Sequence, residues 1–294
     1  MTQNNSTKPP LLIIAGPTAS GKSDAAVALA KRMNGAVISA DSMQVYRHMD
    51  IGSAKIRKDE MQGIDHYLLD CVDPTEEWNV VRFQQLAKEA AAKITREGKL
   101  PILCGGTGFY IQSLLYDIDF TPTSEDTGCR EKLARIAQEQ GPEALHQMLA
   151  QRDPEAAKAI HPNNVKRVIR ALEFLEHSGS RISEHNEKER SRESAYRSAY
   201  IVLTMDRARL YRRIDERVDR MIGRGLVGEV RALRAMGLTS QDVSMQGLGY
   251  RQILDHLDGR YDLEEAVRII KRDTRHFAKR QLTWFRREKD VIWV

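Results

Sequence analysis

This 294-residue sequence contains few cysteines and no histidine pair at metal-ligand spacing. Its three cysteines, Cys71, Cys104 and Cys129, stand far apart, which argues against a disulfide framework and against a zinc site. The eight histidines are equally scattered. Any metal ion is therefore expected to be a hard cation that takes oxygen ligands.

The sequence also lacks a long apolar run and a signal peptide. We therefore expect a cytoplasmic protein without a membrane partner. Hydrophobic residues make up 41% of the chain and charged residues 30%, as in a soluble globular protein of one large domain or two. Residues 1–10 are polar with two prolines and are expected to be disordered.

Positive charge is concentrated near the C-terminus. The net charge is +5, and residues 201–294 hold 20 Lys and Arg against 14 Asp and Glu. This excess is compatible with a polyanionic partner such as nucleic acid. Solubility alone would explain it equally well.

The clearest motif lies between an apolar run at 11–15 and a helical pattern at 26–33. It has the two glycines, the lysine and the hydroxyl residue of a phosphate-binding loop, or P-loop. Backbone N–H groups at the start of the following helix would form an anion site. Lys22 adds a positive charge, and Ser23 offers an oxygen to Mg²⁺. We expect a diphosphate to bind the eight residues Gly16, Pro17, Thr18, Ala19, Ser20, Gly21, Lys22 and Ser23.

A second apolar strand, at 36–40, ends at Asp41. Ligands of open parallel α/β sheets bind beyond the carboxyl ends of the strands, so Asp41 is expected beside the P-loop. A carboxylate there would accept a proton from an amine or hold it by a hydrogen bond. Alternatively, Asp41 caps the next segment, as Asp commonly does. The residues alone leave both interpretations open.

A third strand, at 101–104, runs into the glycine-rich residues 105–108. Such glycines allow close approach of a ligand, but they are equally typical of a tight turn. A nucleoside-triphosphate hydrolase usually places a magnesium-binding aspartate after such a strand. None stands here, and Asp70, near a short strand pattern, is a poor substitute. The sequence therefore favours a loop that holds a diphosphate as a leaving group over one that transfers a phosphoryl group.

Helical patterns dominate residues 116–200, before strand character returns. We therefore predict an α/β fold with a P-loop NTPase-like core and a parallel sheet, formed by residues 11–115 and 201–294. Residues 116–200 are predicted to form a mainly helical insertion domain.

Two groups of basic residues stand on predicted helices. Lys166, Arg167 and Arg170 lie opposite the apolar stripe of their helix, where a solvated face is favoured over nucleic-acid binding on the residues alone. Four arginines, at 213, 217, 220 and 224, line the helix after Asp206, and one aimed at the P-loop would suit a diphosphate. Residues 247–252 are predicted to be a loop in which an aromatic residue stands beside a basic residue, a pair that is useful for stacking on or holding RNA.

Further motifs follow the P-loop in order: DSMQVY at 41–46, MDIGSAK at 49–55, GGTGFY at 105–110, HPNN at 161–164, RALE at 170–173, GYRQ at 249–252 and KRQLTWF at 279–285. Over residues 11–294 the sequence thus resembles tRNA dimethylallyltransferases of the bacterial type, also called tRNA isopentenyltransferases. Ser23 and Ser53 stand where threonine is frequent in that family, which keeps the hydroxyl. The zinc-finger tail of some eukaryotic members is absent.

The resemblance implies transfer of a dimethylallyl group from dimethylallyl diphosphate to the N6 amine of the adenosine 3′-adjacent to the anticodon, in tRNAs that read codons starting with U. Asp41 matches the catalytic aspartate, which would orient the amine and accept its proton. Lys22, Arg217 and Mg²⁺ held through Ser23 would stabilise the departing diphosphate. Thr107 would contact the extruded adenosine or its phosphate. A monomer is expected.

By the same resemblance the insertion binds the anticodon stem, which overturns the preference for a solvated face on its basic helix. The implied tRNA contacts are Asp41, Ser42, Met43, Gln44, Thr107, Arg130, Lys166, Arg167, Arg170, Gln246, Gly247, Leu248, Gly249, Tyr250, Arg251 and Gln252.

Three rival functions share part of this pattern. A small-molecule or nucleotide kinase also begins with a strand, a P-loop and a helix, but the missing acid after the third strand counts against it. An adenylate isopentenyltransferase would have little use for the helical insertion or the basic last third. A non-catalytic RNA-binding module with a nucleotide switch is the third. Labelled dimethylallyl diphosphate, offered with tRNA or AMP, would separate them.

Overall fold

The computed structural model describes residues 8–120 and 127–294. Residues 1–7, most of the segment expected to be disordered, lie outside this description. The chain separates into two compact units, Met1–Asp117 with Ser194–Val294, and Ile118–Glu193. Each unit is described by itself below.

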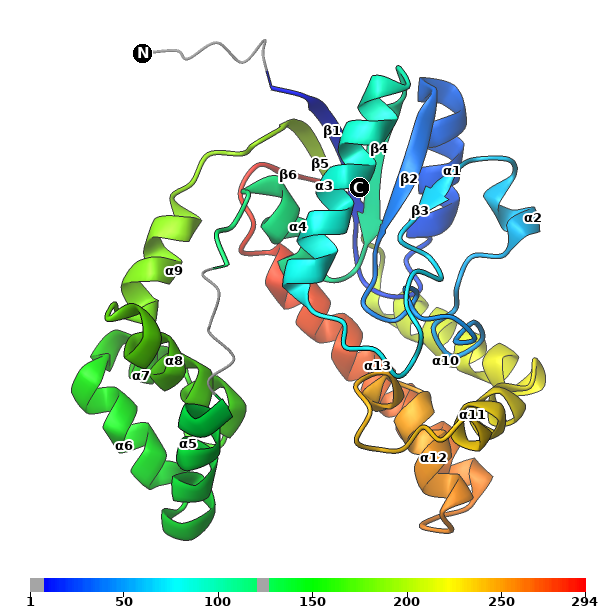
Figure 1. Ribbon diagram of the computed structural model, residues 1–294. Helices are drawn as coiled ribbons and strands as arrows, with labels where there is room; N and C mark the ends of the chain where they lie inside the picture. The colour runs from blue at the N-terminus through cyan, green and yellow to red at the C-terminus, as the bar shows by residue number, and fades with distance from the viewer. Residues whose placement is uncertain (1–7, 121–126) are drawn as a thin grey trace. The chain divides into compact units, whose positions relative to one another are not determined.

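A six-stranded parallel sheet forms the centre of the first unit, in the order β3-β2-β4-β1-β5-β6 (Figure 1). The strands are β1 (Pro10–Ala15), β2 (Gly35–Ala40), β3 (His66–Tyr67), β4 (Leu100–Gly105), β5 (Arg197–Val202) and β6 (Val291–Trp293). Strand β1, which carries the P-loop, lies between β4 and β5, so the loop projects from the middle of the sheet edge.

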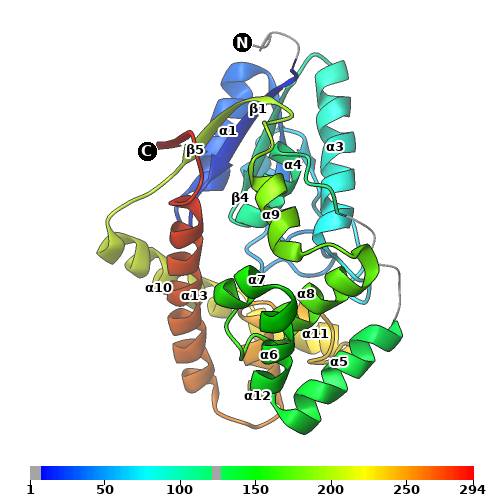
Figure 2. The same cartoon turned by 90° about the vertical axis from the view of Figure 1, so that its left-hand side faces the viewer.

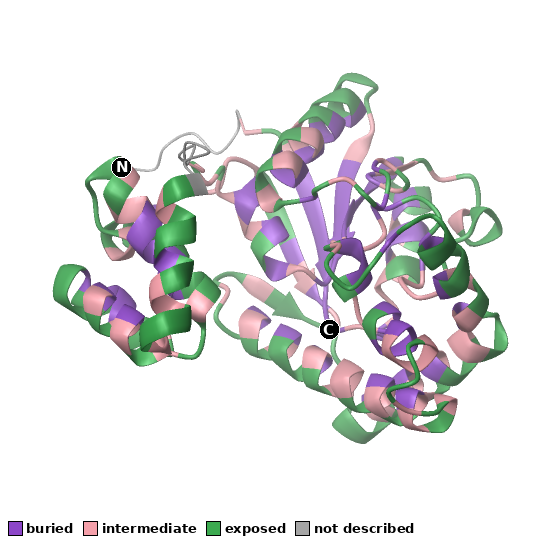
Figure 3. Cartoon of the chain, turned by 60° about the horizontal axis from the view of Figure 1, so that its bottom comes forward, coloured by how far each residue is buried: buried purple, intermediate pink, exposed green. Residues whose placement is uncertain are grey.

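Helices cover both faces of this sheet, which is why its strands read as unbroken apolar runs. Leu12 and Ile14 of β1 face α1 (Lys22–Met33), whereas Leu11 and Ile13 face the side of α3 (Val80–Arg96) and α4 (Gly108–Leu115). Strands β1, β2 and β4 are buried at almost every residue, whereas β3, β5 and β6 are partly exposed. Figure 3 shows buried strands at the centre of the sheet, while the helices are exposed on their outer sides.

The remaining elements of the first unit are mostly helical. They are α2 (Lys58–Met61), α10 (Arg207–Gly223), α11 (Leu226–Ala235), the short 3₁₀ helix Ser244–Gln246, α12 (Tyr250–Leu257) and α13 (Leu263–Phe285). Figure 2 shows α13 as one long helix that ends close to the C-terminal strand. Helix α10 packs against α13 through its apolar stripe, and Asp206 caps its first turn.

The regular elements in the described part of the second unit are all helices. It contains α5 (Thr127–Gln140), α6 (Pro142–Arg152), α7 (Pro154–Ala159), α8 (Val165–Ser178) and α9 (Ile182–Arg190). Its own core gathers Leu145, Leu149, Val168 and Leu172. Together with the parallel sheet, this confirms the predicted fold class.

Element boundaries differ from the sequence predictions in two places. Strand β5 begins at Arg197, within the range 116–200 that was assigned to the insertion. The prediction missed this start because the first three residues of the strand are exposed and show no apolar pattern. Pro10, placed in the disordered segment, is the first residue of β1, a position that requires no N–H group. Among residues 8–120 and 127–294, none of the helices has both the length and the apolar character that a bilayer crossing requires.

Candidate active site

The P-loop has the backbone geometry of a tight turn between β1 and α1. Gly16 has φ 146° and Gly21 φ 94°, and both values favour glycine. A Cβ atom on Gly16 would lie 2.6 Å from the carbonyl oxygen of Leu203. The positive φ angles thus favour glycine at both positions, and at Gly16 a side chain would also clash with Leu203.

Most backbone donors of the loop are available to an anion. The N–H groups of Ala19, Gly21, Lys22 and Ser23 have no hydrogen-bond partner in the described part of the chain. Thr18 is different, because its N–H group donates to Oε1 of Gln281 at 2.8 Å. Free donors at a helix N-terminus favour negative charge.

Two cationic side chains lie at the same place. Nζ of Lys22 donates to the carbonyl oxygen of Pro17 at 2.7 Å, and burial lowers the pKa of Lys22 to about 8. The charge of Arg217 on α10 lowers this pKa further, whereas Cys104 and Asp41 raise it. Burial also lowers the pKa of Arg217, which makes no hydrogen bond or ion pair within residues 8–120 and 127–294. A desolvated, unpaired guanidinium is costly, so this arrangement favours binding of an anion.

Asp41 faces these cations from the end of β2. Its Oδ1 accepts a hydrogen bond from the N–H group of Met43 at 2.9 Å, so the capping interpretation is correct. Oδ2 accepts no hydrogen bond from the described residues. One oxygen therefore fixes the carboxylate, and the other is available to a ligand.

One pocket brings these groups together. Its lining includes residues of the P-loop, of the segment after β2 and of α10 that were predicted as site residues, namely Thr18, Lys22, Ser23, Asp41, Gln44 and Arg217. Gly105, Gly106, Phe277 and Gln281 line it as well. Thr107 is next to this pocket rather than among its lining residues, and it precedes the first turn of α4.

Gln44 is held in the pocket by a loop that the sequence did not connect with the site. Its Nε2 donates to the carbonyl oxygens of Ser53 and Ala54 at 3.4 and 3.3 Å. Glu229 of α11 fixes that loop by accepting three backbone N–H groups, from Asp50, Ile51 and Gly52, at 2.8 to 3.0 Å. Glu229 was missed because its partners are about 180 residues away in sequence.

The segment predicted at 247–252 is partly a helix and partly buried. Tyr250 begins α12, is fully buried and donates to Glu229 at 2.7 Å, so its ring is packed in the core instead of being free to stack on a base. Gln252 is buried too and donates to Asp273 at 3.1 Å. Neither side chain is exposed to solvent, and the Tyr250 hydroxyl supports the loop by accepting a hydrogen bond from the N–H group of Ser53 at 3.1 Å. Gln246 and Arg251 remain exposed, whereas Gly247, Leu248 and Gly249 are less so.

The glycines at 105–108 are explained by close packing against neighbours. A Cβ on Gly105 would lie 2.2 Å from the carbonyl oxygen of Ala40, and one on Gly106 would lie 2.2 Å from Nε2 of Gln281. Asp70, the poor substitute for a magnesium ligand, is bound by the buried Lys55 at 2.5 Å. Asp70 therefore serves the core of this loop and not the phosphate site.

The basic residues of the second unit fall into two classes. Lys166, Arg167 and Arg170 on α8 are exposed and have no ion pair among the described residues. Arg130 on α5 instead forms a two-fold hydrogen bond with the buried Glu173, at 2.8 and 3.0 Å. Its guanidinium is held in one orientation but is still 64% exposed at the side chain.

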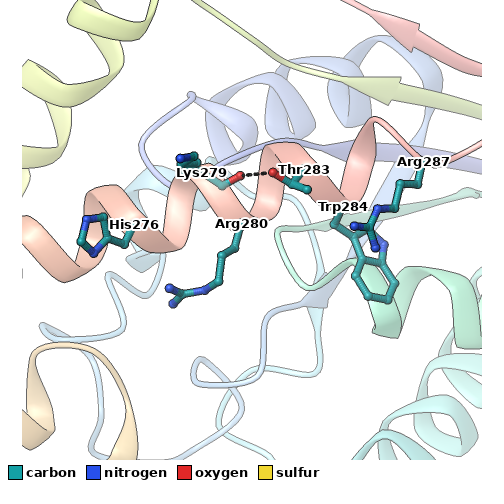
Figure 4. A pocket seen from close by; sticks show the side chains of 6 residues that line it. All are labelled: His276, Lys279, Arg280, Thr283, Trp284 and Arg287. Atoms are coloured by element: carbon teal, nitrogen blue, oxygen red, sulfur yellow. Dashed lines mark hydrogen bonds between the residues drawn. The ribbon is translucent and has the colours of Figure 1, made fainter. Parts of the chain in front are cut away.

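A further basic groove runs along α13 and was not assigned by the sequence analysis. Figure 4 shows Arg280, Trp284 and Arg287 projecting from this helix, with Lys279 on another side. Lys279 and Arg287 make no ion pair in the described part of the chain. Lys279 and Arg280 belong to the motif at 279–285, whereas Arg287 lies just beyond it.

No group of three or more His, Cys, Asp or Glu side chains capable of holding a metal lies within the described residues. Ser23 offers a hydroxyl and Asp41 a carboxylate, but they do not make a complete ligand set. This donor set fits a Mg²⁺ that takes most of its ligands from phosphate oxygens and water.

A model of the IPP transferase family matches residues 44–288. The chain belongs to this family.

Relatives of this IPP transferase share most of its length. A tRNA dimethylallyltransferase of Lachnoclostridium phytofermentans is 57% identical over 285 residues, 97% of this chain and 91% of the relative. The crystal structure of a tRNA isopentenylpyrophosphate transferase from Bacillus halodurans is 45% identical with a TM-score of 0.74, covering 98% of this chain and 90% of that one. A eukaryotic dimethylallyltransferase, crystallised acting on tRNA, is 32% identical with a TM-score of 0.81, covering 94% and 70%.

Proposed function

We propose that this IPP transferase is a tRNA dimethylallyltransferase. It transfers the five-carbon group of dimethylallyl diphosphate to the N6 amine of the adenosine immediately 3′ of the anticodon, in tRNAs that read codons starting with U. The relatives' names support the reaction class. The observation that carries the proposal is the pocket in which free P-loop donors and the unpaired Arg217 face a carboxylate with one free oxygen.

The two halves of this pocket suit the two halves of the reaction. An adenine amine is a weak nucleophile because its lone pair is delocalised into the ring. The free oxygen of Asp41 would orient this amine and take its proton as the C–N bond forms. The bond between the allylic carbon and the diphosphate oxygen breaks at the same time, and the charge that develops on diphosphate meets Lys22, Arg217 and the free N–H groups.

Mg²⁺, bound through Ser23 and the diphosphate oxygens, would supply additional positive charge for the leaving group. Thr107 lies beside the pocket, where contact with the extruded adenosine is compatible with its position. Extrusion costs only a few kcal/mol in a loop. We further propose that the protein acts as a monomer, to be tested by sedimentation.

The RNA-binding surface is proposed to include the exposed cations of α8 and the basic groove of α13. Among the residues that the structure describes, none forms an ion pair that would compete with RNA phosphates at Lys166, Arg167 or Lys279. Arg130, oriented by Glu173, would add a phosphate contact. The kinase alternative is disfavoured, because the only acid that lines the described pocket is Asp41, which follows a different strand from β4.

Mass spectrometry of tRNA after incubation with the enzyme, Mg²⁺ and dimethylallyl diphosphate tests this function directly. A tRNA that reads a U-starting codon should gain the mass of one dimethylallyl group in place of a proton, on the adenosine next to the anticodon. AMP and a tRNA without that adenosine should remain unmodified. Unchanged tRNA, or modified AMP, would contradict the proposal.

Diphosphate binding is expected to weaken as pH rises through about 8, because the pKa of Lys22 in the empty site is lowered to that value. Below this pH Lys22 is protonated and attracts the anion; above it the charge is lost. Calorimetry with inorganic pyrophosphate between pH 6.5 and 9.5 would measure the effect.

The control for this pH dependence is Lys22→Arg, whose side chain keeps its charge across the range. Ionisation of pyrophosphate affects both proteins equally, so the ratio of their dissociation constants isolates Lys22. A ratio that stays constant from pH 6.5 to 9.5 would show that Lys22 does not titrate there.

Lys166→Ala and Arg167→Ala are each expected to weaken binding evenly across tRNAs. Each lost phosphate contact should reduce the slope of log K against log salt by about 1. The comparison is Lys158→Ala on α7, an exposed lysine that is already paired with Glu155 at 2.6 Å. Fluorescence titrations at several salt concentrations would measure these slopes. If both variants had the slope of the wild-type protein, α8 would not be part of the RNA interface.

A further inference from the structure

Gln281 of α13 connects two loops that are far apart in sequence. Its side chain is 7% exposed. Oε1 accepts the N–H group of Thr18 at 2.8 Å, and Nε2 donates to the carbonyl oxygen of Gly106 at 2.9 Å. One amide thus joins the P-loop to the residues that follow β4.

The residues after β4 are shaped to accept this helix. A Cβ on Gly106 would lie 2.2 Å from Nε2 of Gln281, and a Cβ on Gly108 would lie 2.1 Å from Cδ1 of Trp284. Gly106 and Gly108 flank Thr107. Both neighbours of Thr107 therefore lie directly against α13, which fixes the backbone on either side of it.

We propose that Gln281 is a positioning residue that holds the P-loop and the segment 105–108 in one fixed relation. This inference rests on the proposed function, in which the first loop binds the diphosphate of the prenyl donor and the second lies beside the adenosine. Gln281 lines the pocket, but Oε1 and Nε2 of its amide are both bonded to the two loops instead of being offered to a substrate. It would act by aligning the allylic carbon with the attacking amine.

The chemistry of an amide suits this task, because one planar group offers an acceptor and a donor at once. Since the N–H group of Thr18 is used by Gln281, the loop donors left for diphosphate are Ala19, Gly21, Lys22 and Ser23. Misplacement of reacting groups by about 1 Å costs roughly 10²-fold in rate. Loss of the bridge should therefore reduce turnover more than substrate binding.

Gln281→Leu removes both hydrogen bonds at similar volume. We expect kcat to fall roughly 10- to 100-fold, while the affinity for tRNA stays close to that of the wild-type enzyme. The matched control is Gln84→Leu, since Gln84 is a buried glutamine whose Nε2 donates to Ser113 between α3 and α4, at 2.7 Å. This control is expected to lose stability but to keep its kcat. Equal kcat values for the two leucine variants would overturn the proposal.

Gln281→Glu gives a readout that a merely structural role would not change. A protonated carboxyl can accept from Thr18 and donate to Gly106, as the amide does, whereas a carboxylate cannot donate. The ratio of kcat for this variant to kcat for the wild-type enzyme should therefore rise as pH is lowered. A ratio independent of pH would contradict the positioning role, and this measurement decides the question if Gln281→Leu does not fold.

Failure of the proposed function would be seen separately, as wild-type enzyme that leaves tRNA unmodified. In that case binding of inorganic pyrophosphate still tests the bridge. Gln281→Leu is expected to weaken it because the P-loop is no longer held in place, and Gln84→Leu is expected to leave it unchanged. If Gln281→Leu bound pyrophosphate as tightly as the wild-type protein, the proposed effect of Gln281 on the P-loop would be refuted.

Discussion

Replacing Asp41 with asparagine is expected to lower kcat by roughly 10²- to 10⁴-fold, the contribution typical of a general base. Asparagine keeps the oxygen that accepts the N–H group of Met43, so the turn after β2 should be preserved. Only the second oxygen is replaced, by an NH₂ group that cannot take a proton. Single-turnover assays with saturating tRNA and dimethylallyl diphosphate would measure the loss, and binding of both substrates should remain near normal.

Asp206→Asn is the matched control. Asp206 also accepts backbone N–H groups through Oδ1, from Ala208 and Arg209, but it caps α10 and does not line the pocket. Its kcat should equal that of the wild-type enzyme. If Asp41→Asn turned over as fast as this control, Asp41 would be only a capping residue.

The second large effect is expected for Arg217→Ala, which should reduce kcat/KM for dimethylallyl diphosphate by roughly 10²- to 10³-fold, as for other preorganised donors at a developing negative charge. Arg217 has no partner in the described part of the chain, so its removal breaks no internal ion pair and should not lower the melting temperature. Burial destabilises the charge of Arg217 in the free enzyme, Asp41 offsets part of this cost, and a bound anion would offset more of it. Affinity for tRNA should change little.

Arg224→Ala tests whether this effect depends on position. Arg224 continues the same arginine stripe but is exposed at the end of α10. Its removal changes the net charge by the same amount and should leave kcat/KM for the prenyl donor unaltered. Equal losses in the two variants would mean that Arg217 acts through general charge and not through contact with diphosphate.

The sequence predicted best what depends on local patterns. The apolar runs at β1, β2 and β4 and the start of α10 after Asp206 lie close to their expected places, because strand burial and helix initiation are decided within a few residues. The tight turn of the P-loop was equally predictable from its glycines, since the φ angles at Gly16 and Gly21 favour glycine.

Long-range contacts were beyond such patterns. Gln281 and Glu229 each hold a loop near the pocket from a distant part of the chain, and nothing around them in sequence indicates the partner. For Tyr250 a local pattern was misleading, because an aromatic residue beside a basic one suggested a side chain exposed to RNA. In the structure its hydroxyl donates to Glu229 and its ring is buried in the core. Burial of single residues at a loop–helix boundary is set by the whole fold.

The backbone hydrogen bond from the N–H group of Ala195 to the carbonyl oxygen of Leu115, at 2.8 Å, brings the chain back to the first unit at nearly the point where it left. The sheet can therefore close around β1 whatever lies between these two residues. Such a junction lets the helical unit lengthen, shorten or be exchanged during evolution without shifting the register of β5, so the two units are free to diversify at different rates.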